Sequence, residues 1–208
     1  MNRRGKFIAF EGIDGSGKST QVKKLTAFLR AQGHNIHSTF EPTDSPIGKI
    51  IRDIFNHQME GDQRVIAALF VADRLNHLLN TTDGMLKKIE EGYIVITDRY
   101  YLSSYAYHSI HGIDLDWVIQ ANSLSAGLLR PDVHLFIDTD PEQSIDRLIA
   151  GRDNIEMYEN LSTLKKVQQM YYDVFKKVGS SENIRLINGN RSVDAIFEDV
   201  LHQVRLLL

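Results

Sequence analysis

Residues 6–25 read KFIAFEGIDGSGKSTQVKKL and carry the strongest structural signal in the chain. It opens with an apolar run, Lys6–Phe10, which is typical of a buried β-strand. Residues 12–19 then satisfy the pattern G-x-x-x-x-G-K-[ST] of a phosphate-binding loop. The apolar residues that follow fall on one helical face: Val22, Leu25, Phe28 and Leu29. A strand, a glycine-rich loop and a helix in this order predict a site for a nucleoside triphosphate.

The residue types in the loop match the chemistry of phosphate binding. Glycines let the chain fold back so that its backbone N–H groups converge on the β-phosphate, and the helix N-terminus adds positive potential. Lys18 can reach between the β- and γ-phosphates, and the Ser19 hydroxyl suits Mg²⁺. The predicted ATP-binding residues are Gly12, Ile13, Asp14, Gly15, Ser16, Gly17, Lys18, Ser19 and Thr20.

Outward from the loop, strand-like and helix-like segments alternate to the end of the chain. Further strands are predicted at Ile36–Phe40, Tyr93–Thr97, Val133–Ile137 and Ile184–Ile187. Helices are predicted at 18–32, after a Ser45-Pro46 cap, after Asp62, near 84–89, and at 141–150, 158–178 and 193–207. This alternation predicts an α/β fold with a five-stranded parallel sheet between two helical layers. No linker or repeat interrupts it, so we expect a single domain over residues 1–208.

Composition narrows the function classes. The 208 residues carry a net charge of −3, whereas a general nucleic-acid or anionic-membrane binder is usually basic. No cysteine is present, which excludes disulfides, thiolate metal sites and a catalytic thiol. The longest apolar run, Val65 to Ala72, is far too short for a membrane span, and the first apolar run is too short for a signal peptide. We therefore expect a cytoplasmic protein that binds neither nucleic acid nor membranes.

A second functional signal follows the strand Tyr93–Thr97, which ends in Asp98-Arg99-Tyr100. Because the carboxyl ends of parallel strands face the ligand crevice, Asp98 and Arg99 should lie beside the phosphate-binding loop. An aspartate there can hold a magnesium-bound water, and an arginine can grip a second phosphate with two parallel hydrogen bonds. The turn from Glu41 to Pro46 ends the second predicted strand and should open onto the same crevice.

Together these segments resemble the thymidylate kinase family, the P-loop enzymes that phosphorylate dTMP with ATP. The resemblance runs through almost the whole chain in the family's order and spacing. Its segments are Phe10-Glu11-Gly12 with the loop, EPTDSPIG at 41–48, LFVADR at 69–74, Asp-Arg-Tyr at 98–100 with Ser103 and Ala106-Tyr107, Pro131-Asp132, and DTDPE at 138–142. The family implies a three-layer α/β/α P-loop kinase fold with a small lid, here at about 147–157.

The resemblance also implies site roles at the matched positions. Phe70 should stack on the thymine ring, Arg74 should meet its polar edge, and Arg99 should clamp the acceptor phosphate. Asp14 lies where the family touches the sugar 3′-hydroxyl. The predicted substrate-binding residues are Asp14, Glu41, Phe70, Arg74, Arg99, Ser103 and Tyr107, and the predicted metal-binding residues are Ser19 and Asp98.

Three residues depart from the family pattern. Phe40 and Met157 stand where relatives often have arginines, and His108 stands where a glutamine is frequent. The family supplies an arginine to the transferred phosphate either from the loop, where this chain has Gly15, or from the lid. The predicted catalytic residues are Lys18, Asp98, Arg99 and Arg152, with Arg147 in support.

Phosphoryl transfer between two nucleotides predicts a mechanism that depends on positioning and on cations. The acceptor is a phosphate monoester with a second pKa of about 6, so it is largely a dianion at pH 7 and needs no catalytic base. Two alternatives stay open: a deoxynucleoside kinase, and a nucleotide-binding module that has lost catalysis through the changes at Phe40 and Met157. Relatives are usually homodimers, and the apolar faces at 65–79 and 100–125 could supply the interface.

Overall fold

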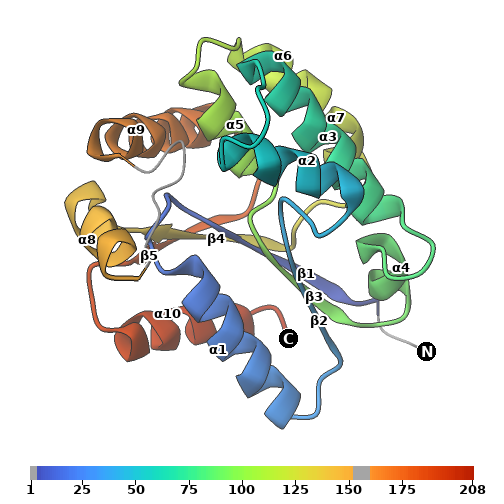
Figure 1. Cartoon of the computed structure of the whole chain (residues 1–208). Helices are drawn as coiled ribbons and strands as arrows, with labels where there is room; N and C mark the ends of the chain where they lie inside the picture. Colours follow the sequence, from blue (N-terminus) through green and yellow to red (C-terminus); the bar gives the residue numbers. More distant parts are fainter. Residues whose placement is uncertain (1–3, 152–159) are drawn as a thin grey trace.

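Five parallel strands form the centre of the computed structural model, which describes residues 4–151 and 160–208 (Figure 1). The strands are β1 (Lys6–Glu11), β2 (Ile36–Phe40), β3 (Ile94–Asp98), β4 (Val133–Asp138) and β5 (Ile184–Asn188). Their order across the sheet is β2-β3-β1-β4-β5, and every neighbouring pair is parallel. The predicted five-stranded parallel sheet is therefore confirmed, and each strand end lies within one residue of its predicted position.

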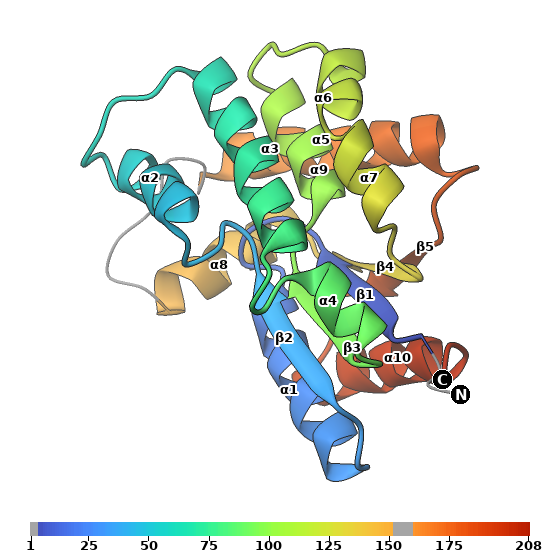
Figure 2. The same ribbon diagram turned by 90° about the vertical axis from the view of Figure 1, so that its right-hand side faces the viewer.

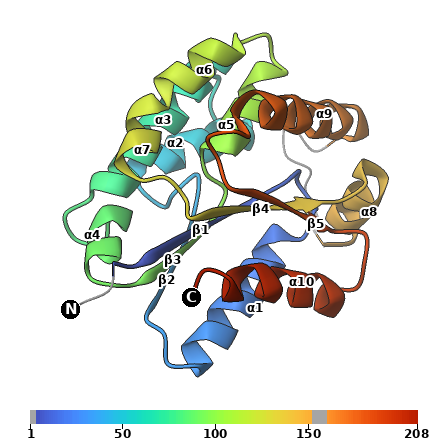
Figure 3. The ribbon, with the colours of Figure 1, turned by 180° about the vertical axis from the view of Figure 1, so that it is seen from behind.

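Helices cover both faces of this sheet, as predicted. One face is covered by α1 (Lys18–Ala31) and α10 (Val193–Arg205), which pack on each other below the sheet in Figures 1 and 3. On the opposite side, Figure 2 shows α2 (Pro46–Phe55), α3 (Gln63–Leu79), α4 (Met85–Glu90), α5 (Tyr101–Ser109), α6 (Leu115–Ala121), α7 (Ser123–Leu128) and α9 (Leu161–Val178). The remaining described helix, α8 (Pro141–Gly151), follows β4 beyond the carboxyl end of the sheet.

Strand alternation divides the core into two clusters and fixes which way the site residues point. In β1, Phe7 and Ala9 pack with α5 and α9, whereas Ile8 and Phe10 pack with α1 and α10. Glu11 continues the first set and is fully buried on the α9 side. In β3, Ile94 and Ile96 belong to the α1 cluster, so Asp98 continues that set and meets α1.

Side-chain caps begin α2 and α3 at the positions predicted from the sequence. The Ser45 hydroxyl accepts a hydrogen bond from the Gly48 N–H, and the Asp62 carboxylate accepts one from the Arg64 N–H, so both predicted caps are confirmed. The apolar stretch at 100–125 forms three short helices, α5, α6 and α7. The predicted helix at 158–178 is described from Leu161 onward, with Asn160 as its cap.

β1 lies between β3 and β4 in the sheet. The connection that leaves β1 runs to β2, on the β3 side, whereas the connection that leaves β3 crosses to β4 on the other side of β1. Such a reversal opens a crevice at the carboxyl ends of the strands. The phosphate-binding loop follows β1 at that point. Among residues 4–151 and 160–208, each helix is too short or too polar to span a bilayer.

Candidate active site

The phosphate-binding loop closes around the side chain of its own lysine. Lys18 is the first residue of α1, and its Nζ donates to the Ile13 carbonyl at 2.8 Å and to Ser16 Oγ at 3.4 Å. Burial and the nearby Arg99 charge lower the pKa of Lys18 to about 8, against the opposing effects of Asp98 and Asp14. Lys18 therefore carries its positive charge at pH 7, inside the hollow where a phosphate would sit.

Gly15 is required by the geometry of the loop. Its φ is +76°, in the left-handed region, and a Cβ at this position would lie 2.2 Å from the Ser144 carbonyl oxygen. No side chain fits between the loop and α8 at this point. The close packing of Gly15 against α8 therefore leaves no room for an arginine side chain at this position of the loop.

Ser19 and Asp98 come together at the start of α1 and the end of β3. The Ser19 hydroxyl donates to Asp98 Oδ2 at 2.5 Å. A hydroxyl and a carboxylate beside a phosphate site fit Mg²⁺, which prefers oxygen ligands and is usually bound by one or two protein groups together with phosphates and waters. The two predicted metal-binding residues are therefore adjacent, and their donor atoms suit that ion.

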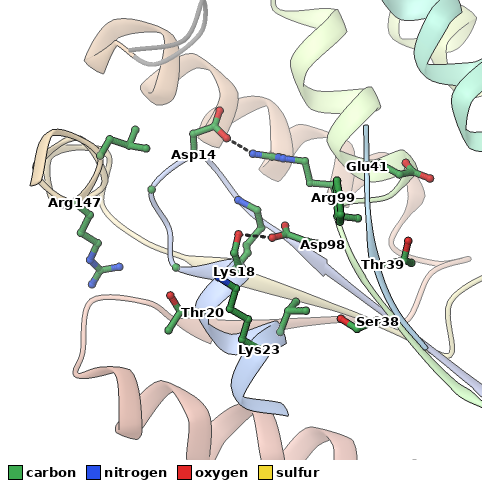
Figure 4. A pocket seen from close by; sticks show the side chains of 16 residues that line it. Asp14, Lys18, Thr20, Lys23, Ser38, Thr39, Glu41, Asp98, Arg99 and Arg147 are labelled. Atoms are coloured by element: carbon green, nitrogen blue, oxygen red, sulfur yellow. Dashed lines mark hydrogen bonds and ion pairs between the residues drawn. The ribbon is translucent and has the colours of Figure 1, made fainter. Parts of the chain in front are cut away.

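Arg99 faces Asp14 across the crevice, and the two form an ion pair (Figure 4). The Arg99 guanidinium also donates to Ser103 Oγ at 3.0 Å and to Tyr107 Oη at 3.3 Å. Tyr107 in turn donates to Asp14 Oδ2 at 2.8 Å. Burial acts to raise the pKa of Asp14, but the charges of Arg99 and Lys18 outweigh burial and hold that pKa below its usual value.

The backbone of Arg99 adopts a conformation that is uncommon for a residue other than glycine. Its φ is +75°, a left-handed conformation that a non-glycine residue adopts at a cost of about 1–2 kcal/mol. The Arg99 N–H donates to the Phe10 carbonyl at 2.9 Å, which fixes the turn after β3 to the end of β1. Backbone strain of this kind persists only where the surrounding structure holds the residue in place, and it is found most often at functional sites.

Glu11 is buried and is linked to Arg99 through Ser103, which contacts both side chains. Its Oε2 accepts hydrogen bonds from Ser103 Oγ at 2.5 Å and from Tyr171 Oη at 3.3 Å. Burial raises the pKa of Glu11 to about 7, although the Ser103 hydrogen bond and the Arg99 charge lower it. Sequence reasoning assigned Glu11 to the motif but missed its role as a support.

A second buried ion pair joins the end of β2 to α3. Arg74 Nη2 and Nε donate to Glu41 Oε2 at 2.6 and 2.9 Å, and both side chains are 1% exposed. Arg74 also donates to Asn122 Oδ1 at 2.5 Å and to Ser104 Oγ at 3.0 Å. Four of its five N–H groups thus have protein partners in this structure. Asn122 and Ser104 were not expected from the sequence.

Phe70 lies on α3 with its ring partly buried. Its centroid is 6.0 Å from that of Phe55 and 5.2 Å from that of His108. His108 is 2% exposed, and neither of its ring nitrogens has a hydrogen-bond partner among the described residues. Burial lowers the pKa of His108 to about 3, so this imidazole is neutral at pH 7.

A cavity of about 660 Å³ runs along the loop between α1, β2 and α8. Ten of the predicted site residues line it: Asp14, Gly15, Gly17, Lys18, Ser19, Thr20, Glu41, Asp98, Arg99 and Arg147. Ser103 and Tyr107 lie behind its wall, in contact with Arg99. Phe70 and Arg74 also lie outside its wall, and Arg74 contacts it through Glu41.

The predicted lid falls only partly within the described residues. Arg147 lies on α8 and points away from Asp14 and Arg99 (Figure 4). Its guanidinium donates to the Ser16 carbonyl at 3.2 Å and to the Gly189 carbonyl at 3.0 Å, so it ties the loop to the end of β5. Arg152 and Met157 lie outside the described residues.

Comparisons with known proteins agree with this geometry. A family model described as thymidylate kinase matches residues 10–200. A probable thymidylate kinase of Pyrococcus abyssi is 36% identical over 207 residues, with 97% of each chain covered. Thymidylate kinases of Desulfotalea psychrophila and Caldicellulosiruptor saccharolyticus are 35% and 34% identical, covering 100% and 97% of this chain and 98% and 95% of their own lengths.

Proposed function

The chain belongs to the thymidylate kinase family, whose members phosphorylate dTMP to dTDP with ATP, and we propose how its residues divide this work. The observation that carries the proposal is the meeting of three groups in one cavity. These are the loop lysine Lys18, the Ser19–Asp98 pair and the Asp14–Arg99 pair. Together they offer a phosphate cradle, oxygen ligands for a metal and a second cation for another phosphate.

ATP occupies the loop in this proposal. The backbone N–H groups of residues 12–20 hold its phosphates, and the Lys18 ammonium moves from the Ile13 carbonyl to the β- and γ-phosphates. Ser19 and Asp98 hold Mg²⁺, which when bound would neutralise charge on those phosphates. ATP as the phosphoryl donor follows from the family, and the identity of the metal is part of the proposal.

dTMP occupies the β2 side of the cavity in this proposal, and its base extends past the cavity wall toward α3. Arg99 turns its fork of donors from Asp14 to the acceptor phosphate, and Asp14 with Tyr107 is then free to meet the sugar. The thymine ring lies against Phe70, and the remaining N–H of Arg74 faces the polar edge of the base. Glu41 holds Arg74 in that orientation, and Ser103 holds Arg99.

The chemical step needs alignment and neutralisation of charge rather than a base. The acceptor dianion attacks the γ-phosphorus, the β–γ bridging bond breaks, and the bonding electrons leave with ADP. Lys18 and Arg99 stabilise the oxygens on either side of the transferred group. Arg152 is our candidate for the cation on the group itself, with Arg147 in support once it leaves the Ser16 carbonyl.

Three wider properties belong to the same proposal. Residues 147–157 act as a lid that closes over ATP and excludes water, within a single domain over 1–208. The apolar faces at 65–79 and 100–125 carry a homodimer interface. The cytoplasm is the expected compartment.

The test is coupled ADP release with ATP·Mg²⁺ and a panel of dTMP, dUMP, dCMP, dGMP and thymidine, repeated with Arg152→Ala. Turnover on dTMP that is lost in the variant supports both the substrate and the lid cation. Turnover that survives Arg152→Ala keeps the substrate and moves the cation elsewhere. Turnover on thymidine alone favours a deoxynucleoside kinase, and binding of both nucleotides without turnover favours a module that has lost catalysis.

A further inference from the structure

The cavity wall holds four cationic side chains from the described residues, and three of them already have protein acceptors. Lys18 donates to the Ile13 carbonyl, Arg99 pairs with Asp14, and Arg147 donates to two backbone carbonyls. The fourth is Lys23, on α1. It is exposed, and the structure gives it no hydrogen bond or ion pair to any described residue.

The position of Lys23 on α1 directs it toward the phosphates. Lys23 follows Ser19 by four residues, which places the two side chains on one face of the helix, one turn apart. Side chains on a helix lean toward its N-terminus, so the Lys23 ammonium extends back toward the loop. Figure 4 shows Lys23 between Thr20 and Ser38, and all three residues line the cavity.

The strand β2, which faces Lys23, carries no lysine or arginine side chain. In β2, Ile36 packs with the α1 cluster, so Ser38 and Phe40 also point to the α1 side. Phe40 pairs in register with Asp98, the residue of β3 that contacts Ser19. Phe40 is 44% exposed and its side chain has no hydrogen-bond donor, so it cannot donate a hydrogen bond to a phosphate.

We infer that Lys23 is a phosphate-binding residue of this kinase and supplies the acceptor phosphate with the positive charge that position 40 lacks. The inference rests on the proposed function, in which dTMP lies on the β2 side of the cavity. The acceptor brings about two negative charges against the γ-phosphate, and Arg99 is the only other cation assigned to it among the described residues. An ammonium group on a flexible, exposed stem can follow the acceptor as it enters and stay with it during transfer.

The inference is tested with steady-state kinetics of Lys23→Ala and with calorimetric dTMP binding. A lost hydrogen bond to a charged phosphate should lower kcat/KM for dTMP about 10- to 100-fold and weaken dTMP binding, while KM for ATP changes less than about threefold. Lys23→Arg should keep most of the activity. Phe40→Arg in the Lys23→Ala background should restore at least tenfold, because it returns a cation from the facing strand.

Lys24 offers a matched control on the neighbouring position. Its ammonium pairs with Asp194 and lies 4.9 Å from the Phe197 ring centroid, on the α10 side of the helix. Lys24→Ala removes the same charge from the chain, so it reports the effect of net charge without a change in the cavity. We expect its kcat/KM for dTMP to stay within about twofold of the wild type.

The outcomes separate this inference from the proposed function. If the wild type phosphorylates dTMP and Lys23→Ala matches Lys24→Ala, the inference is wrong and the function stands. If Lys23→Ala raises KM for ATP rather than for dTMP, the assignment to the acceptor is wrong. If the wild type shows neither turnover nor dTMP binding, both fail, whereas dTMP binding that weakens in Lys23→Ala without turnover supports Lys23 and rejects the activity.

Discussion

Replacing Arg74 by methionine should destabilise the fold by about 3–5 kcal/mol, because Glu41 is then left as a buried carboxylate without its cation. Methionine keeps most of the apolar stem, so the change removes mainly the guanidinium. The lost contacts are two hydrogen bonds to Glu41 and one each to Asn122 and Ser104. Within a total stability of about 5–15 kcal/mol for a domain, this loss is large.

Urea denaturation followed by circular dichroism measures the effect. With a slope of about 3 kcal/mol per molar urea, at the upper end for small proteins, the midpoint should fall by roughly 1–1.7 M. Arg64→Met on the same helix is the matched control, since the Arg64 side chain is 82% exposed and pairs with Asp62 at the surface. We expect no resolved shift of the midpoint for that variant.

The double variant Arg74→Met/Glu41→Gln isolates the pair. Glutamine removes the buried charge, so the double variant should be more stable than Arg74→Met alone by about 1 kcal/mol or more. A midpoint for Arg74→Met within about 0.3 M of the wild type would refute the reasoning. It would mean that water reaches Glu41 or that another cation replaces Arg74.

Gly15→Ala must adopt a φ of +76° and bring a Cβ within 2.2 Å of a carbonyl oxygen of α8, so KM for ATP should rise at least tenfold; an unchanged KM would contradict the loop geometry. The folded state binds a proton at Glu11 up to about pH 7, while its ordinary pKa is 4.5, so the contribution of Glu11 to stability is largest below pH 4.5 and is lost as pH rises between these values. Between pH 4.5 and pH 8, the free energy of unfolding measured in urea should therefore fall by roughly 3 kcal/mol more for the wild type than for Glu11→Gln. An equal fall in the two proteins would show that the folded wild type does not hold this proton. His108→Leu removes two buried nitrogens without partners among the described residues and should raise Tm by about 2–4 °C; a lower Tm would show that ordered water satisfies the imidazole.

The fold was predictable because its signals are local. The strands β1, β3 and β4 are short, mainly apolar runs, the loop is a consecutive motif, and the caps at Ser45 and Asp62 are single residues next to the helices they begin. The strand-end rule was sufficient to bring Asp98 to Ser19, since parallel strands end at one edge of the sheet.

The support of the site was not predictable in the same way. Tyr171 meets Glu11 across 160 residues of sequence, and Asn122 meets Arg74 across 48, so no local pattern marks either contact. Glu11 did carry a signal: a carboxylate at a core-facing position of an apolar strand. Phe70 illustrates the opposite difficulty, because an aromatic residue on a helix face has the same appearance in sequence whether it packs in a core or meets a ligand.

Three polar groups of the cavity are paired with protein acceptors, and this pairing has a consequence for nucleotide exchange. The Lys18 ammonium, the Ser19 hydroxyl and the Arg99 guanidinium each already have a protein acceptor. Nucleotide entry therefore exchanges one set of acceptors for another, and the net binding free energy is only the difference between them. The same protein acceptors stand ready when the products leave, so ADP and dTDP depart without stranding a charge. A site arranged in this way favours moderate affinity and rapid product release over tight retention.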